Sequence, residues 1–301
     1  MLKMLSKKNE ENILELKEYG KLPLLKYPLL EQTGIVEHCF TTRLGGVSEG
    51  VCSSLNLSFS RGDDPEAVME NYRRVAETFG KTVDDFVCTD QTHTTNVLRV
   101  GREHCGYGVT KEKPYTDVDG LITNEPGVIL STFYADCVPL YFVDPVNKAI
   151  GLSHSGWRGT FGRMGQKTLD AMKEAFGTKP EDVYVAIGPS ICQDCYEISE
   201  EVASRFREGF WQEKAIKTYC TELYDSGKYP RSEYLLPGKI EGKWQLDLWL
   251  ANYAVLRSAG IPMENISITD VCTCCNAPYL FSHRATGGKR GNLGAFLMIK
   301  G

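Results

Sequence analysis

The sequence lacks the features that mark membrane proteins and nucleic-acid-binding proteins. No apolar run reaches the roughly 18 residues of a membrane-spanning helix. Basic residues are not in excess, because the chain has 34 Lys and Arg and 39 Asp and Glu, so its charge gives no reason to expect nucleic acid or an anionic membrane as a partner. Residues 1–8 are basic but run into a polar segment at 9–12, which argues against a signal peptide. We expect a cytoplasmic protein with no nucleic-acid or membrane partner.

Histidine is scarce, and internal repeats and low-complexity linkers are absent. The chain has only five histidines in 301 residues, too few for a multicopper centre that would take most of its ligands from imidazoles. The remaining composition, 42% hydrophobic and 24% charged, is that of a globular protein. A chain of this length buries a large core without needing disulfides.

Cysteine, in contrast, is abundant. Eleven cysteines form an odd set without the regular spacing of a disulfide scaffold, so we expect mostly free thiols in a reducing compartment. Cys192 and Cys195 form a Cys-x-x-Cys pair that suits a metal half-site or a redox pair. Cys272, Cys274 and Cys275 form a second group, without a partner cluster at zinc-finger spacing. For both groups we favour packed thiols over a metal site.

Periodicity and turn signals predict one mixed α+β domain. Strands and helices are interspersed without the strict alternation of a doubly wound sheet. Residues 1–30 are expected to form a peripheral N-terminal arm, and residues 31–301 a single catalytic domain. The expected strands are 35–41, 86–88, 97–100, 128–134, 182–187, 265–269 and 295–299. The expected helices are 6–19, 65–79, 160–176, 200–210 and 245–260.

Three residues could together bind a metal ion. Cys137 and His154 lie at the ends of strand-like runs, and His93 lies in a polar loop between two expected strands. Two imidazoles and a thiolate suit Zn²⁺ and leave a fourth position for water, whose pKa such a site lowers to about 7. Ca²⁺ and Mg²⁺ prefer oxygen ligands. Two alternatives stay open: His93 is simply solvated, or Cys137 is a nucleophile with His154 as its base.

Further candidates surround these three residues. Asp136 is a candidate proton carrier, but if it shares a strand with Cys137 the pleat turns it to the other face, where its role would be structural. Arg43, Arg158 and Arg284 lie beside or near glycines in turns, and the planar guanidinium suits phosphate. A plain loop with a solvated Arg43 is the simpler alternative for the first of them.

The chain resembles the YfiH-like family, also called laccase-domain or polyphenol-oxidase-like proteins. The ordered set of matching segments is far more specific than any one segment. It runs TTRLGGVS at 41–48, SLNL at 54–57, QTH at 91–93, DGLIT at 119–123, ADCVP at 135–139, HSGWRG at 154–159, IGPSI at 187–191, CYE at 195–197 and FSHR at 281–284.

The resemblance implies a fold, a cofactor and an activity. It implies an α/β/β/α arrangement of layered mixed sheets flanked by helices, with Zn²⁺ held by His93, Cys137 and His154. It implies phosphorolysis of adenosine, inosine and 5'-methylthioadenosine, together with deamination of adenosine. The substrates would then be a purine nucleoside and phosphate. Within this framework we expect catalytic roles for Cys137, Asp136 and Arg158.

Substrate or phosphate binding is expected at three further positions of the matching segments, Arg43, Asn56 and Arg284. The chain departs from the family pattern in places: Ser155 replaces the usual Ala, Ala285 replaces a second Arg, and Thr94 replaces a Gly. Two alternative activities accompany the resemblance. One is a cysteine-dependent hydrolase that edits peptidoglycan precursors, and the other is a copper polyphenol oxidase.

Overall fold

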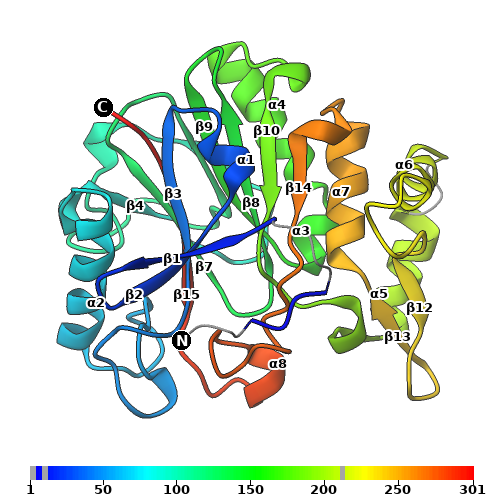
Figure 1. Ribbon diagram of the computed structural model, residues 1–301, viewed down its shortest axis with the longest axis horizontal. Helices are drawn as coiled ribbons and strands as arrows, with labels where there is room; N and C mark the ends of the chain where they lie inside the picture. Colours follow the sequence, from blue (N-terminus) through cyan, green and yellow to red (C-terminus); the bar gives the residue numbers. More distant parts are fainter. Residues whose placement is uncertain (1–4, 9–12, 211–213) are drawn as a thin grey trace.

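Two six-stranded mixed sheets form the centre of the computed structural model, which describes residues 5–8, 13–210 and 214–301 (Figure 1). The first sheet has the order β1 (Glu15–Tyr19), β2 (Leu22–Lys26), β3 (Val36–Thr41), β15 (Leu293–Ile299), β7 (Ile129–Tyr134), β4 (Phe86–Cys88). The second has the order β14 (Ile266–Ile268), β10 (Tyr184–Ile187), β8 (Val138–Asp144), β9 (Ala149–Ser155), β6 (Gly120–Thr123), β5 (Val97–Arg99).

The two sheets pack against each other through a shared core. Along β8 the apolar side chains alternate, so that Tyr141 and Val143 face the first sheet while Leu140 and Phe142 face the other way. Opposite them, Leu130 of β7 and Leu297 of β15 belong to the same inter-sheet core. Each large apolar side chain buried in this way contributes about 1.5–3 kcal/mol relative to exposure.

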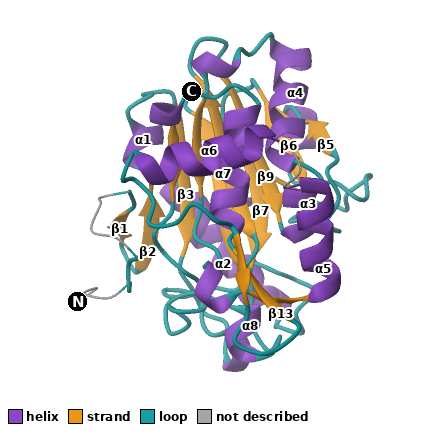
Figure 2. Cartoon of the chain, turned by 90° about the vertical axis from the view of Figure 1, so that its right-hand side faces the viewer, coloured by secondary structure: helices purple, strands orange, loops and turns teal. Residues whose placement is uncertain are grey.

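Helices cover the outer face of each sheet (Figures 1 and 2). Helix α2 (Pro65–Thr78) packs on the first sheet, where its Val68, Tyr72 and Val75 join the core of Phe86 and Phe296. Helices α4 (Met164–Phe176) and α7 (Leu248–Ser258) pack on the second sheet. The resulting order is helix, sheet, sheet, helix, which confirms the predicted α+β class with mixed sheets flanked by helices.

The remaining elements are smaller. A three-stranded sheet has the order β11 (Glu197–Ser199), β13 (Lys243–Leu246), β12 (Leu235–Pro237). The other α-helices are α1 (Pro28–Glu31), α3 (Trp157–Phe161), α5 (Glu200–Arg205), α6 (Lys214–Asp225) and α8 (His283–Thr286). Short 3-10 turns cover Gly50–Cys52, Val83–Asp85, Arg102–His104, Pro180–Asp182, Gln193–Cys195 and Met263–Asn265, and Phe206–Phe210 is a π-helical turn. Among the residues placed by the structure, none of the helices has the length and apolar character needed to cross a bilayer.

Local structure agrees with the sequence where capping signals are strong. Asp64 caps α2 by accepting a bond from the Glu66 N–H, with Pro65 at the first helical position, as predicted. The helix expected over 160–176 is broken, because Arg163 adopts a left-handed conformation (φ 61°) between α3 and α4. The helix expected from residue 245 begins only at Leu248, since the preceding residues pair as β13.

The helix predicted over residues 6–19 is wrong. Residues 15–19 form β1, which pairs antiparallel with β2 from Tyr19↔Leu22 to Glu15↔Lys26, while residues 9–12 lie outside the described part of the chain. Pairing with β2, whose residues are all buried, outweighs the helical propensity of the segment. Strand β2 in turn pairs with β3, which attaches this N-terminal hairpin to the first sheet.

Candidate active site

The candidate metal ligands come from the segments that connect the two sheets. Cys137 lies in the short link from β7 of the first sheet to β8 of the second. His93 lies in the loop from β4 of the first sheet to β5 of the second, with a left-handed backbone (φ 68°). His154 lies near the end of β9 and pairs with Pro139 of β8. The three side chains therefore meet at the seam between the sheets.

Their donor atoms converge. One ring nitrogen of His93, one of His154 and the Sγ of Cys137 all lie within 4.8 Å of one another. The two imidazole centroids are 5.1 Å apart with their planes at 75°. Gly156 keeps this space open, because a Cβ there would lie 3.0 Å from the Cys137 Sγ and 3.2 Å from the Cδ2 of His93. The need for this space explains why the HSGWRG segment has a glycine at position 156.

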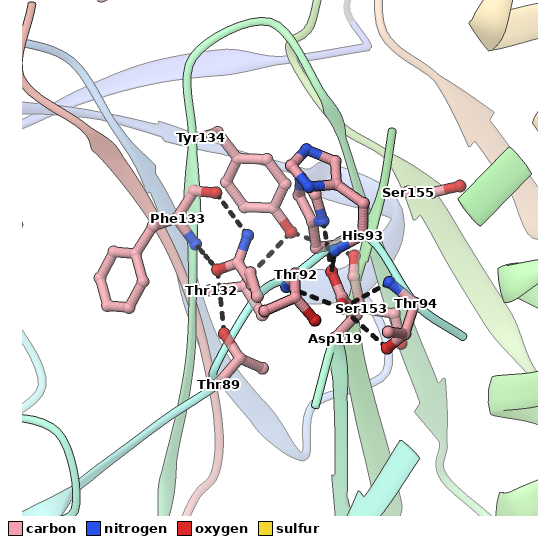
Figure 3. A network of polar contacts seen from close by, with 12 residues as sticks. Thr89, Thr92, His93, Thr94, Asp119, Thr132, Phe133, Tyr134, Ser153 and Ser155 are labelled. Carbon is pink, nitrogen blue, oxygen red and sulfur yellow. Dashed lines mark hydrogen bonds and ion pairs between the residues drawn. The ribbon is translucent and has the colours of Figure 1, made fainter. Parts of the chain in front are cut away.

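Asp119 holds the His154 ring and the loop of His93 in place, and Figure 3 shows its position beside Thr92, His93 and Thr94 of this loop. Its Oδ1 lies 2.8 Å from the Nδ1 of His154 and accepts a 3.1 Å bond from the His93 N–H. Its Oδ2 accepts bonds from the N–H groups of Thr92 and Thr94, at 3.1 and 2.8 Å. With Nδ1 of His154 engaged by a carboxylate, Nε2 is the nitrogen available to a metal ion. The sequence reasoning assigned Asp119 no role; its only signal was its place at the start of a strand in a matching segment.

Electrostatics favour a thiolate at Cys137. Burial alone raises the pKa of this thiol, but the neighbouring His154 and His93 outweigh it and lower the pKa to about 6. Burial correspondingly lowers the pKa of His154, while Cys137 and Asp119 raise it to about 9. The two shifts describe one thiolate–imidazolium pair. A deprotonated sulfur next to two imidazoles is a donor set that fits Zn²⁺.

The three donors open onto a cavity of about 740 Å³. This volume falls in the range of small-molecule sites, about 300–1,000 Å³. Aromatic side chains and positively charged side chains both line it. The aromatic residues are Phe59, Tyr72, Phe133, Tyr134, Trp157 and Tyr196, and the basic ones besides the metal-site histidines are Arg61, Lys113, His283, Arg284 and Arg290.

Asp136 lies in the same link as Cys137 but outside the strand, with φ 93°. Its Oδ1 accepts a 2.6 Å bond from the Thr273 hydroxyl, and its Oδ2 accepts a 2.7 Å bond from the Arg284 N–H. Both carboxylate oxygens therefore connect the metal-site link to the C-terminal segments. Asp136 also lines the cavity, so the geometry places it beside the candidate site.

The predicted anion-binding residues are not all brought together. Arg284 lines the cavity, with its guanidinium held by the carbonyl oxygens of Cys195 and Glu197 at 3.0 and 2.8 Å. Arg43 is not among the lining residues; it donates to the carbonyls of Ser53 and Ala277.

Two more predicted residues lie outside the cavity lining. Arg158 is exposed, and its guanidinium lies 4.3 Å from the Trp157 ring centroid. Asn56 is buried and donates to Asp63, while its Oδ1 accepts bonds from the N–H groups of Ser58 and Asn292. Of the predicted substrate-binding and catalytic residues, Cys137, Asp136 and Arg284 meet in one cavity.

Arg290 is a cavity cation that the sequence reasoning missed. The residue is 8% exposed, and its buried Nε has no hydrogen-bond partner among the described residues. Burial, and then the nearby Arg61, lower the pKa of Arg290 to about 10. Two guanidinium groups close together in a partly desolvated cavity favour an anionic ligand. The basic GGKR run at 287–290 was the available signal.

Comparisons with known proteins identify the family of the chain. The family model described as multi-copper polyphenol oxidoreductase laccase matches residues 37–300. The chain belongs to this laccase-like YfiH family. A YfiH-family relative, purine nucleoside phosphorylase YlmD of Geobacillus stearothermophilus, is 34% identical over 85% of this chain and 88% of its own length. Adenosine deaminase RL5, from an unknown prokaryotic organism, is 30% identical over 85% of this chain and 91% of its own length.

Solved structures of the YfiH family share the fold. The crystal structure of YlmD from Geobacillus stearothermophilus matches with a TM-score of 0.82 at 32% identity, covering 97% of this chain and 100% of that chain. The Bacillus licheniformis protein YfiH matches with a TM-score of 0.82 at 29% identity, covering 96% of this chain and 100% of that chain. Each match covers nearly the whole chain, and therefore both of the sheets whose segments carry the site residues.

Proposed function

We propose that this YfiH-family chain is a zinc-dependent purine nucleoside phosphorylase that also deaminates adenosine. The observation that carries the proposal is the convergence of His93, Cys137 and His154 on one wall of a cavity with aromatic and basic walls. The substrates we propose are adenosine, inosine and 5'-methylthioadenosine with inorganic phosphate. Relatives named for both activities support it.

The cavity walls suit the two substrates. Tyr196 and Trp157 line the cavity, and their aromatic rings would provide apolar contact for a purine. Arg61, Arg284 and Arg290 offer guanidinium groups for phosphate. In phosphorolysis a phosphate oxygen bonds to C1' of the ribose while the C1'–N9 bond breaks, its electron pair goes to the purine, and a proton neutralises the released base. Holding the phosphate close to C1' is the part that these arginines would play.

Zn²⁺ held by His93, Cys137 and His154 would supply Lewis acidity and would lower the pKa of a water in the fourth position. Asp119 would keep His154 in the tautomer that presents Nε2 to the ion. Asp136 would act as a positioning residue, because its Oδ2 fixes the backbone of Arg284. Deamination replaces the amino group on C6 of adenosine by the oxygen of water and releases ammonia.

Metal analysis combined with a phosphate-dependent assay for free purine base tests the proposal. Cys137→Ala should lose the zinc of this site, phosphorolysis and deamination together. Cys105→Ala, which removes a partly buried thiol that does not line the cavity, should keep all three. Retention of this zinc and full turnover in Cys137→Ala would refute the proposal.

A cysteine hydrolase that edits peptidoglycan precursors is the second candidate. The lowered pKa of Cys137 next to His154 is what favours it, because a thiolate with an adjacent imidazole is a nucleophile–base pair. Chelation separates the two functions: a metal-free hydrolase survives a strong chelator, whereas the phosphorylase loses activity and regains it with added Zn²⁺.

A copper polyphenol oxidase, as the family description suggests, has weaker support. Of the five histidines, His38 is buried and accepts the Tyr27 N–H, and His104 accepts the Gly101 N–H. Neither lines the cavity, so among the described lining residues His283 is the one imidazole besides those of His93 and His154. Oxidation of a phenol by the copper-loaded protein at a rate above that of nucleoside phosphorolysis would favour this candidate instead.

A further inference from the structure

Four cysteines from two distant Cys-x-x-Cys pairs meet at a second place in the fold. The Sγ atoms of Cys192, Cys195, Cys272 and Cys275 all lie within 4.8 Å of one another, and those of Cys195 and Cys275 are 3.5 Å apart. The sequence favours packed thiols for Cys192 and Cys195, and also for the group of Cys272, Cys274 and Cys275, which has no partner cluster at zinc-finger spacing. The structure supplies the partner.

Sheet topology brings the two pairs together. Strands β10 and β14 are parallel neighbours in the second sheet, so the segments that follow them leave the same edge. Ser190 and Cys272 form a further parallel bridge beyond the strands, and the Thr273 N–H donates to the Ser190 carbonyl at 3.1 Å. Each segment then carries one Cys-x-x-Cys turn.

The backbone is arranged to stabilise negative charge on sulfur. The N–H groups of Cys192 and Cys275 point at the Cys272 Sγ, at 3.3 and 3.4 Å. Each Cys-x-x-Cys turn thus gives one N–H to the same sulfur, as backbone N–H groups do around bound thiolates. Cys272 is fully buried, so a negative charge on its sulfur would have to be balanced within the protein, as a bound cation would do.

We propose that these four cysteines bind one Zn²⁺ ion in a tetrahedral tetrathiolate site. Four thiolates are a zinc or iron ligand set, and a closed set of four protein ligands marks a structural rather than a catalytic ion. A Zn–S bond of about 2.3 Å puts tetrahedral sulfur atoms about 3.8 Å apart. The observed separations are 3.5 Å for Cys195 and Cys275 and at most 4.8 Å for every pair, so small side-chain movements would reach that geometry.

The second site would support the first. Thr273, next to Cys272, donates its hydroxyl to Asp136, which is adjacent to Cys137. The carbonyl oxygen of Cys195 accepts the Arg284 guanidinium at 3.0 Å. An ion that joins Cys195 to Cys272 therefore fixes the two segments that hold Asp136 and Arg284 at the cavity.

Metal counting tests the proposal on the intact protein purified with a reductant. We expect two zinc ions per chain in the unmodified protein and one in each of Cys137→Ser and Cys195→Ser. The double variant should hold none. Cys274→Ser removes the neighbouring thiol that is outside the proposed ligand set, so it should keep both ions. Cys195→Ser should keep the ion of the catalytic site. The zinc count of this variant therefore tests the four-cysteine site, whereas the phosphorylase assay tests the proposed function.

Cobalt substitution of Cys137→Ser gives a readout that does not require Cys195→Ser to fold. With the catalytic site disabled, Co²⁺ should still produce intense thiolate-to-cobalt charge-transfer absorption of a tetrahedral site. Absence of that band would overturn the proposal. So would a disulfide between these cysteines in the reduced protein, iron with acid-labile sulfide in place of zinc, or an unchanged zinc count in a folded Cys195→Ser.

Discussion

Asp119 and His154 form a buried polar contact in the candidate site, with 2.8 Å between Oδ1 and Nδ1. The Asp119 carboxylate is fully buried, and it also accepts the N–H groups of three consecutive loop residues, Thr92, His93 and Thr94. Burial alone raises the pKa of Asp119, but His154 and then Thr94 outweigh it, so the group stays ionised. One side chain thereby orients the imidazole of His154 on a strand and fixes the loop backbone that carries His93.

Asp119→Asn should weaken metal binding at the first site by about 10- to 100-fold, because the amide loses the charge that orients His154. The measurement is the dissociation constant for Zn²⁺ from competition with a chelator. Asp117→Asn is the matched control, since Asp117 also bonds Thr92 but through the hydroxyl and at the surface. Equal affinities for the two variants would contradict the orienting role of Asp119.

In the metal-free protein, Cys137 should be alkylated by iodoacetamide with a rate midpoint near pH 6. The thiolate is the reactive form, and its pKa is lowered from 9.0 to about 6, so the rate should be close to its plateau at pH 7 and fall below pH 6. Peptide mass spectrometry measures the rate at this residue. Added Zn²⁺ should protect it.

His154→Gln is the control for the origin of this shift. His154 is the main cause that lowers the pKa of Cys137, so its removal should move the midpoint upward. Cys88 is an internal reference, because burial raises its pKa to about 12 and it should stay unmodified near neutral pH. A midpoint near 9 in the unmodified protein would contradict the thiolate–imidazolium pair.

Arg290→Lys should raise the KM for phosphate by about 10- to 100-fold, since a charged hydrogen bond contributes about 1.5–3 kcal/mol and lysine lacks the planar fork. Adenosine deamination uses no phosphate, so its kcat/KM should change little in the same variant. Arg73→Lys, on the exposed side of α2, is the matched control. A parallel loss of both activities would show that Arg290 does not act through phosphate.

Asp247→Asn should remove a pH dependence of stability. Burial raises the pKa of Asp247 from 3.8 to about 6, despite its capping bond from the Leu250 N–H. Between pH 4 and pH 6 the folded state keeps a proton that the unfolded state releases, so the free energy of unfolding falls as pH rises, by up to about 3 kcal/mol.

The variant keeps a good N-cap residue but no ionisable group. Its free energy of unfolding relative to the unmodified protein should therefore increase from pH 4 to pH 7, as measured by urea denaturation at each pH. Asp64→Asn makes the same change at the exposed N-cap of α2 and controls for the substitution itself. Parallel pH profiles for Asp247→Asn and the unmodified protein would rule out this role of Asp247.

Local signals made much of the fold predictable. The Asp64-Pro65 cap located α2, and the apolar runs located strands such as β7. The β1 hairpin was missed because its strand identity comes from pairing with β2, not from the composition of residues 15–19.

The part of the site that could be predicted is the part that residue types and the order of the matching segments indicate. The three candidate ligands were proposed from residue types and from the resemblance. Which arginines face the cavity depends on packing between distant segments, so Arg43 was proposed and Arg290 overlooked. The four-cysteine cluster was invisible for the same reason, since only the parallel pairing of β10 with β14 joins its halves.

The links between the sheets have a consequence for folding. His93 and Cys137 lie on connections between the first and second sheets, and His154 lies on β9 of the second. None of the described sheets carries all three, so the complete ligand set exists only after the sheets have docked. Tight metal binding at this site therefore requires the docked sheets, and a partly folded chain would bind the ion only weakly.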